Sequence, residues 1–367
     1  MEIISYFSVI HLVVFPILIE PRSKMKNFLR LLVISLFILC ITFGLSIPLV
    51  ASQELELVFI DVGQGDSALI VTPEGKAILI DAGETGQVSA VFKALNSRGI
   101  EHIDVIVASH PHMDHIDGLI DILEAYGVGK IIEPGKAVYS DSYPAFILEA
   151  QKRGIPIELA KAGSSLEVGS VKMDVLSPAG SLPDDVDDCS IVIKLSYGSF
   201  SALFPGDIGS VVENVLLSEN ELTPVSILKV SHHGSITSSS EAFLNRVMPK
   251  YSVISVGNDN GYGHPSAFVL MRLSVIGSIV LRTDLNGDII FRTDGRTIGV
   301  TVSKGSIPVV QKVLAPSSKY VASKNSDVFH YSTCSSVKTI KPGNLIVFTS
   351  REEAVKSGRR PCSICKP

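Results

Sequence analysis

The sequence predicts an α/β protein: two mixed β-sheets covered by helices, with a small zinc-stapled domain at the C-terminus. Between Leu55 and about Val302, short apolar runs alternate with helical patterns. Turn signals at Tyr197-Gly198-Ser199 and Leu285-Asn286-Gly287 indicate β-hairpins. Many strands with hairpins and interspersed helices are typical of helix-covered sheets. The last stretch, 320–367, is too short for a robust core but carries His and Cys in pairs.

The predicted elements follow one another along the chain. Apolar runs predict strands at Leu55–Asp61, Ser67–Thr72, Ala77–Asp81, Ile103–Ser109, Ser190–Tyr197, Phe200–Pro205, Ile227–Ser231, Tyr251–Val256, Ser278–Thr283, Asp288–Arg292 and Gly299–Val302. Helical periodicity predicts helices near Val88–Asn96, Ile116–Ala125, Ala145–Lys152, Gly209–Leu217 and Ala267–Val275. A stretch rich in Ser, Pro, Gly and Lys predicts a linker at 303–319, between a main domain at 54–302 and a small one at 320–367.

Residues 1–52 are predicted to be an export signal or a membrane anchor. The segment Phe28–Val50 is apolar, and the basic residues in front of it resemble the start of a signal peptide. In our preferred interpretation synthesis starts at Met25 and cleavage follows near Val50-Ala51-Ser52. Otherwise the segment remains as an anchor whose start is held in the cytoplasm. Both routes predict an extracytoplasmic, secreted or membrane-anchored protein, with membrane contact only through an uncleaved segment.

Composition narrows the possible partners and the role of the cysteines. The chain has 32 Lys and Arg against 37 Asp and Glu, a formal net charge of −5, so no global basic field indicates nucleic-acid binding. Of the five cysteines, one lies in the apolar N-terminal segment and one stands alone. The remaining three cluster at the C-terminus, a distribution that suits a metal better than disulfides.

The most informative run carries His110, His112, Asp114 and His115 at the end of the strand predicted over Ile103–Ser109. Imidazoles and a carboxylate crowded at a strand end suit a divalent metal such as zinc. The first two histidines, two positions apart, can face one point, and the next two residues can face a second point nearby. Paired ions about 3.5–4 Å apart serve hydrolytic enzymes. A cluster of solvated loop residues is the simpler alternative, which this order of ligand types disfavours.

Further ligands must come from distant strand ends. Asp207 ends an apolar strand and fits a bridging carboxylate, although it could instead cap a helix. His232 and His233 also end a predicted strand; we expect one of them to be a ligand and take His232 as the candidate. His264 lies in a Gly-rich loop, where the alternative is a solvated histidine.

These residues belong to an ordered set of motifs that resembles the metallo-β-lactamase superfamily, and within it the extracytoplasmic domain of ComEC-like competence proteins. The motifs are Asp61-Val62-Gly63-Gln64-Gly65-Asp66-Ser67, Leu79-Ile80-Asp81-Ala82-Gly83, the His110–His115 run, Gly206-Asp207, Lys229-Val230-Ser231-His232-His233-Gly234-Ser235 and His264-Pro265-Ser266. The resemblance implies an αββα sandwich with the site along the sheet edge, two divalent ions (zinc or manganese), and hydrolysis by a metal-bound hydroxide.

The resemblance also assigns roles. It gives His110, His112, Asp114, His115, Asp207 and His264 the ligand positions, with Asp114, Asp207 and His264 as the catalytic residues. It makes Asp81 a support that orients a ligand imidazole. The sequence departs from many members at one place: no histidine occurs from Ile116 to Gly206. Asp187 or Asp188 could stand in for the missing ligand.

The C-terminal residues His330, Cys334, Cys362 and Cys365 have the paired spacing of a structural zinc site. The stretch from Tyr320 resembles the metal-binding domain of the DNA-repair protein Ada, whose first cysteine accepts a methyl group. Histidine stands at that position here, so the resemblance implies binding or structure rather than methyl transfer. Phosphate contacts and a merely solvated basic surface are equally open roles for Lys338, Lys341, Arg351, Lys356, Arg359 and Arg360.

Together these observations predict an exported metal-dependent hydrolase, and our first hypothesis is a phosphodiesterase or nuclease acting on DNA or a nucleotide. Hydrolysis of a lactone, β-lactam or thioester is the first alternative, because this fold hosts many chemistries. A non-catalytic surface DNA-binding protein is the second. DNA is the one macromolecular partner we expect, and no protein partner is predicted.

Overall fold

The computed structural model describes residues 54–308 and 320–367, apart from 139, 220, 333, 341–343 and 349. The predicted export segment and most of the predicted linker lie outside the described residues. Within the described ranges, no helix has the length and apolar character needed to cross a membrane.

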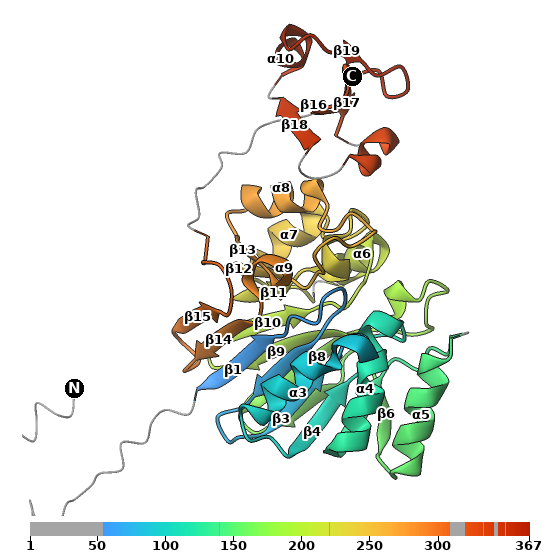
Figure 1. Cartoon of the computed structure of the whole chain (residues 1–367), viewed down its shortest axis with the longest axis vertical. Coiled ribbons are helices and arrows are strands. Elements are labelled where there is room, and N and C mark those ends of the chain that lie inside the picture. The colour runs from blue at the N-terminus through green and yellow to red at the C-terminus, as the bar shows by residue number, and fades with distance from the viewer. Residues whose placement is uncertain are drawn as a thin grey trace, which may run out of the picture. The chain divides into compact units, whose positions relative to one another are not determined.

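The main domain contains two β-sheets (Figure 1). The first has, in spatial order, β15 (Ile298–Val302), β14 (Ile289–Thr293), β1 (Leu55–Phe59), β2 (Ala68–Val71), β3 (Ala77–Ile80), β4 (His102–Val107), β5 (Gly127–Glu133) and β6 (Ile157–Leu159). The second has β13 (Ile279–Arg282), β12 (Tyr251–Ile254), β11 (Ile227–Lys229), β10 (Phe200–Phe204), β9 (Val192–Tyr197), β8 (Val171–Ser177) and β7 (Ser165–Val168).

The two sheets bury one apolar core between them. In β1, Leu57 and Phe59 point into this core, whereas Val58, between them, belongs to the core on the opposite face. The Phe59 ring stacks on Phe204 of the second sheet, with centroids 5.7 Å apart. A strand buried on both faces is apolar at every position, which explains the unbroken apolar runs in the sequence.

Helices cover the outer faces. The first sheet packs against α3 (Val88–Asn96), α4 (Met113–Ala125) and α5 (Ser142–Lys152), and the second against α6 (Ser210–Ser218), α7 (Glu241–Val247) and α8 (Ala267–Val275). In α4 the buried apolar residues recur at helical spacing, at Ile116, Leu119, Ile122 and Leu123. The predicted αββα sandwich is confirmed.

The structure differs from the sequence predictions at several elements, among them α7, which was not predicted. The strands β5 to β8 were not predicted; β6 and β7 are short and largely exposed, so they lack a strong apolar signal. The hairpin predicted at Leu285-Asn286-Gly287 is wrong. A short helix, α9 (Thr283–Asn286), stands there and carries the chain from β13 in the second sheet to β14 in the first. The hairpin at Tyr197-Gly198-Ser199 is confirmed, since β9 and β10 pair antiparallel around it.

The described part of 320–367, which we predicted to be a C-terminal domain, contains a four-stranded sheet, an α-helix and the short 3-10 helix η5 (Ser335–Thr339). Its strands lie in the order β18 (Leu345–Phe348), β16 (Tyr320–Ser323), β17 (Val328–Tyr331) and β19 (Arg360–Pro361), and its helix is α10 (Arg351–Lys356). Ala322, Phe329, Phe348 and Ala354 form a small buried core.

The topology of the main domain brings chemically active residues to one edge. Strands β3 and β4 run parallel in the first sheet, and β10, β11 and β12 run parallel in the second. The carboxyl ends of parallel strands meet at one edge, where α/β proteins commonly bind ligands. The segments that leave these five ends carry Asp81, the His110–His115 run, Asp207, the His232-His233 pair and His264.

Candidate metal centre

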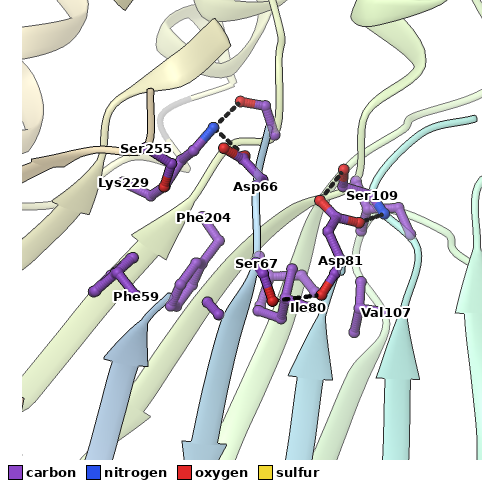
Figure 2. Close-up of a pocket in the computed structure, with 14 residues that line it drawn as sticks. Phe59, Asp66, Ser67, Ile80, Asp81, Val107, Ser109, Phe204, Lys229 and Ser255 are labelled. Atoms are coloured by element: carbon purple, nitrogen blue, oxygen red, sulfur yellow. Dashed lines mark hydrogen bonds and ion pairs between the residues drawn. The ribbon is translucent and has the colours of Figure 1, made fainter. Parts of the chain in front are cut away.

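The run after β4 is held by a network behind it. Asp81, buried at the end of β3, accepts hydrogen bonds from the Ser109 backbone N–H (2.7 Å) and the Ser109 hydroxyl (2.6 Å). Its Oδ2 also lies 2.9 Å from Nδ1 of the fully buried His115. Figure 2 shows the Asp81 and Ser109 part of this network. Because Nδ1 of His115 donates to Asp81, the ring is oriented with Nε2 toward the site, where it could offer a lone pair to a bound cation.

One group of potential ligands consists of His110, His112 and Asp187. Their ligand atoms lie within 4.8 Å of one another. Asp187 Oδ1 is 2.9 Å from His112 Nδ1 and 3.7 Å from His110 Nε2. Asp187 belongs to the short helix η3 (Asp187–Cys189) in the region where the sequence lacks a histidine. Its neighbour Asp188 points elsewhere and accepts a hydrogen bond from the Gly209 N–H (2.7 Å).

A second group consists of Asp114, His115 and His233, also within 4.8 Å. Asp207 links the two groups, because its Oδ2 is 3.4 Å from His115 Nε2 and 3.3 Å from His233 Nε2, and because His110, His115 and Asp207 form a further group. His233 Nε2 is also 3.2 Å from Asp114 Oδ2. We call the seven residues of these groups the metal centre: His110, His112, Asp114, His115, Asp187, Asp207 and His233.

The orphaned atoms of the centre fit a divalent cation. His115 Nε2 and His233 Nε2 are buried and have no hydrogen-bond partner. Leaving such a group unsatisfied costs about 1–3 kcal/mol. Both atoms face Asp207 Oδ2, and imidazole nitrogens converging on a carboxylate oxygen are the donor set of zinc and manganese sites.

The protonation of the centre leads to the same conclusion. Burial alone would lower the pKa of His115 and of His233, but Asp207 and the neighbouring carboxylates outweigh it and raise both pKa values well above the usual range. Burial would raise the pKa of Asp207, yet His233, His115 and Lys229 hold it well below its usual range. Without a metal, protons on two histidines therefore balance the buried carboxylates. A divalent cation at this position would displace them.

A family comparison decides the identity of the fold. The model of the Metallo-beta-lactamase superfamily matches residues 60–258, which is more than half of the chain. The chain belongs to the metallo-β-lactamase superfamily. Membership of this superfamily implies that the chain binds divalent metal and belongs to a family of metal-dependent hydrolases.

Three of the relatives that the chain matches are ComEC-like proteins. ComE operon protein 3 of Bacillus subtilis is 30% identical over 67% of this chain and 34% of its own length. Competence protein ComA of Neisseria gonorrhoeae is 32% identical over 66% of this chain and 33% of its own. Recombination protein 2 of Haemophilus influenzae is 30% identical over 63% of this chain and 28% of its own. The chain thus spans about a third of the length of these relatives.

In this metallo-β-lactamase domain, the adjacent histidines of the Ser231–Gly234 turn divide their roles. Both have left-handed backbones, with φ of 51° and 52°. His233 is buried, and its Nδ1 donates to the Ser255 carbonyl oxygen (2.9 Å), which leaves Nε2 for the centre. His232, our sequence candidate, lies at the pocket wall with its Nε2 4.0 Å from Asp207 Oδ2. The sequence left this pair undecided, and the structure brings His233 into the cluster.

His264 also reaches the pocket. Its ring lies 5.7 Å from that of His232 and stacks on Tyr262, with centroids 5.8 Å apart. Asn260 holds its backbone, accepting from the His264 N–H and donating to the His264 carbonyl. Burial, together with His233 and His232, lowers the pKa of His264 to about 4, so its imidazole is neutral at neutral pH.

A pocket of about 290 Å³ opens over the centre. Besides residues of the centre, it is lined by Gln64, Met113, His232, Tyr262 and His264. Met113 and Tyr262 are 52% and 74% exposed, so the mouth carries apolar surface. Behind the centre, between the sheets, lies a much smaller cavity of about 20 Å³, shown in Figure 2. It has room for about one water molecule.

Sequence reasoning missed two residues that adjoin the centre, Asp66 and Lys229. Asp66 lies in the loop before β2, which passes so close to α4 that a Cβ on Gly65 (φ 131°) would be 2.2 Å from the Asp114 carbonyl oxygen. Lys229 ends β11 and is 3% exposed. A lone lysine in an apolar strand is the available signal, since a buried lysine needs a paired carboxylate.

The C-terminal domain brings its four predicted ligands together. The ligand atoms of His330, Cys334, Cys362 and Cys365 lie within 4.8 Å, and we call this group the thiol cluster. The cysteines are free rather than paired in disulfides. Backbone N–H groups of Tyr331 and Ile364 donate to the sulfurs of Cys365 and Cys362, both at 3.4 Å. The cluster fits a metal-binding domain.

Proposed function

We propose that this chain is an exported hydrolase that uses two divalent ions to cleave phosphodiester bonds in DNA or nucleotides. The observation that carries the proposal is the pair of ligand groups sharing Asp207 at the floor of an open pocket. Two adjacent ions suit phosphodiester hydrolysis because one can activate a water while both stabilise charge on the phosphate.

The residues of the chain have separate tasks in this proposal. His110, His112, Asp187 and Asp207 would hold one ion, and Asp114, His115, His233 and Asp207 the other. Asp81 keeps the His115 ring in the ligating orientation. His264, neutral because its pKa is about 4, offers a lone pair to the pocket as a ligand or proton acceptor. His232, 27% exposed, lies close enough to move a proton at the pocket wall.

Two observations favour a nucleic-acid substrate. The exposed ring of Tyr262 beside the centre offers a face on which a base can stack. One relative is named a recombination protein, and recombination acts on DNA. We further propose that the protein functions outside the cytoplasm, as the sequence of residues 1–52 predicts.

We also propose that the C-terminal domain holds one structural zinc and contributes to DNA binding. Arg351, Lys356 and Arg360 are exposed there, although Arg360 also pairs with Asp327 at 2.9 Å. Deleting 320–367 should weaken binding to DNA but leave hydrolysis of a small phosphodiester unchanged. Equal loss of both would assign the domain a structural role only.

The test of the main proposal is a substrate panel. The purified chain, loaded with Mn²⁺ or Zn²⁺, is incubated with single-stranded DNA, bis-p-nitrophenyl phosphate, and nitrocefin together with a lactone and a thioester. We expect cleavage of the first two, and loss of it in Asp114→Ala. Cleavage of nitrocefin, the lactone or the thioester without phosphodiester cleavage would contradict the proposal.

A further inference from the structure

A buried lysine lies directly behind the metal centre. The Lys229 side chain is 4% exposed and ion-pairs with Asp66 Oδ2, itself on a 9% exposed side chain. The lysine Nζ also lies 3.4 Å from the Gly206 carbonyl oxygen and 3.5 Å from Asp207 Oδ1. Figure 2 shows the Lys229 side chain reaching toward Asp66 at the carboxyl end of its strand.

These contacts divide the two oxygens of the shared carboxylate. Oδ1 of Asp207 faces the lysine, and Oδ2 faces the free nitrogens of His115 and His233. A carboxylate is planar, so a cation fixed on one oxygen determines where the other points. The contact with the Gly206 carbonyl holds the preceding residue as well, where the backbone turns through a left-handed φ of 57°.

The lysine also reaches the second group through its other partner. Asp66 Oδ2 pairs with Lys229, while Asp66 Oδ1 lies 3.3 Å from Nδ1 of His233. Lys229 therefore holds the Asp207 carboxylate directly. The Nδ1 hydrogen of His233 goes to the Ser255 carbonyl oxygen, so Asp66 acts on the His233 ring through its charge.

We propose that Lys229, together with Asp66, is a positioning device that sets the orientation of Asp207 and His233 for metal binding. Neither residue lines the open pocket, so neither touches the substrate. The inference rests on the proposed metal centre but not on the identity of the substrate. A buried ion pair is a poor source of stability, because apolar residues of similar volume often do as well. We therefore assign to this ion pair the role of orienting the ligands.

The decisive variant is the double substitution Lys229→Met/Asp66→Asn. It removes one positive and one negative charge, so the net charge beside the centre stays the same. A change in metal affinity then reports geometry rather than long-range attraction. The single variant Lys229→Met leaves the buried Asp66 and Asp207 without their lysine partner and serves as the comparison. Lys76→Met/Asp104→Asn, which removes another ion pair (2.9 Å) outside the metal centre, is the matched control.

The readout is binding of Mn²⁺ to the metal-stripped full chain, measured by titration calorimetry and by the spin-resonance signal of free Mn²⁺. Folding is checked by circular dichroism in the presence of chelator. We expect the double variant to fold but to bind Mn²⁺ about 10–100-fold more weakly at one or both sites, the loss typical of removing a group that orients a ligand. The control should bind as the unchanged chain does.

A double variant that binds both ions within threefold of the unchanged chain would overturn the inference. If that variant does not fold, Lys229→Arg takes its place, since it keeps the charge and alters the geometry, and the 20 Å³ cavity beside Lys229 offers some room. The same threefold limit applies to it. Absence of Mn²⁺ binding by the unchanged chain would instead disprove the metal centre itself, and the inference with it.

Discussion

The metal centre and the thiol cluster differ in where their ligands come from along the chain. The metal centre gathers nitrogen and oxygen ligands from four separate segments, and it lies below an open pocket of about 290 Å³. The thiol cluster takes three sulfurs and one nitrogen from two short stretches, with Cys334 and Cys362 each 6% exposed. Closed sulfur-rich sites commonly stabilise a fold, whereas open sites with carboxylates and imidazoles leave room for a reacting molecule. The comparison supports the proposal of chemistry at the metal centre and of stabilisation at the thiol cluster.

The strongest test of these two assigned roles is a reciprocal pair of substitutions. Asp114→Ala should reduce phosphodiester hydrolysis to the background of the metal-free chain while circular dichroism stays unchanged. Cys362→Ser should remove one zinc per chain and unfold the C-terminal domain, as limited proteolysis would report, while hydrolysis of bis-p-nitrophenyl phosphate continues. The assignment of roles is wrong if Cys362→Ser abolishes this hydrolysis or Asp114→Ala retains it.

A smaller effect tests the support behind the ligands. Asp81→Asn keeps the shape of the side chain but removes the charge that fixes the His115 ring through its Nδ1. We expect a 10–100-fold loss of Mn²⁺ affinity, measured by calorimetry on the full chain. Zinc content of the thiol cluster, measured by metal analysis, should not change. Unchanged Mn²⁺ affinity would show that His115 is oriented by other contacts.

Much of the metal centre is predictable because its ligands follow strand ends that the sequence marks clearly. His110, Asp114 and Asp207 each follow an apolar run, and parallel strands bring such ends to one edge. The sequence does not indicate whether His232 or His233 turns inward, because the two residues are adjacent and both adopt a left-handed backbone. Lys229 and Asp66 come from opposite sheets, so their pairing appears only once the sandwich is assembled.

The strands of the fold also divide into those that the sequence predicts and those that it does not. Strands with two buried faces were predicted, because most positions in them are apolar. The edge strands β6 and β7 escaped prediction because exposed positions interrupt their pattern. The erroneous hairpin at Leu285-Asn286-Gly287 has a topological cause: turn residues are equally suited to end a helix that crosses between sheets.

The mouth of the pocket provides a milder test of the substrate. Tyr262→Ala removes a ring that is 74% exposed and stacked on His264. Stacking of one base contributes about 1–3 kcal/mol, so we expect KM for single-stranded DNA to rise about tenfold with little change in kcat. Kinetics with bis-p-nitrophenyl phosphate, which has no base, are the control. Equal effects on both substrates would indicate that the ring only supports His264.

The smallest expected effect concerns pH and separates the metal-free from the metal-loaded chain. In the metal-free fold the carboxylates raise the pKa of His115 and His233 above the ordinary value of about 6.5. Their stabilising contribution is therefore complete below about pH 6.5 and is lost as pH rises through the higher folded values. The lowered pKa of Asp207 gives a contribution that is lost only in acid, as pH falls below its usual range.

The metal-free chain should thus be most stable in mildly acidic solution and lose several degrees of Tm toward pH 9, since about 1 kcal/mol corresponds to about 2–4 °C for a domain of this size. Bound Mn²⁺ should reverse the alkaline trend, because metal binding needs neutral imidazoles and gains strength as protons leave. Differential scanning calorimetry with chelator and with Mn²⁺ measures both curves. Asp207→Asn is the control: without that charge the alkaline loss should shrink. An alkaline loss of equal size in Asp207→Asn would place its origin elsewhere in the chain.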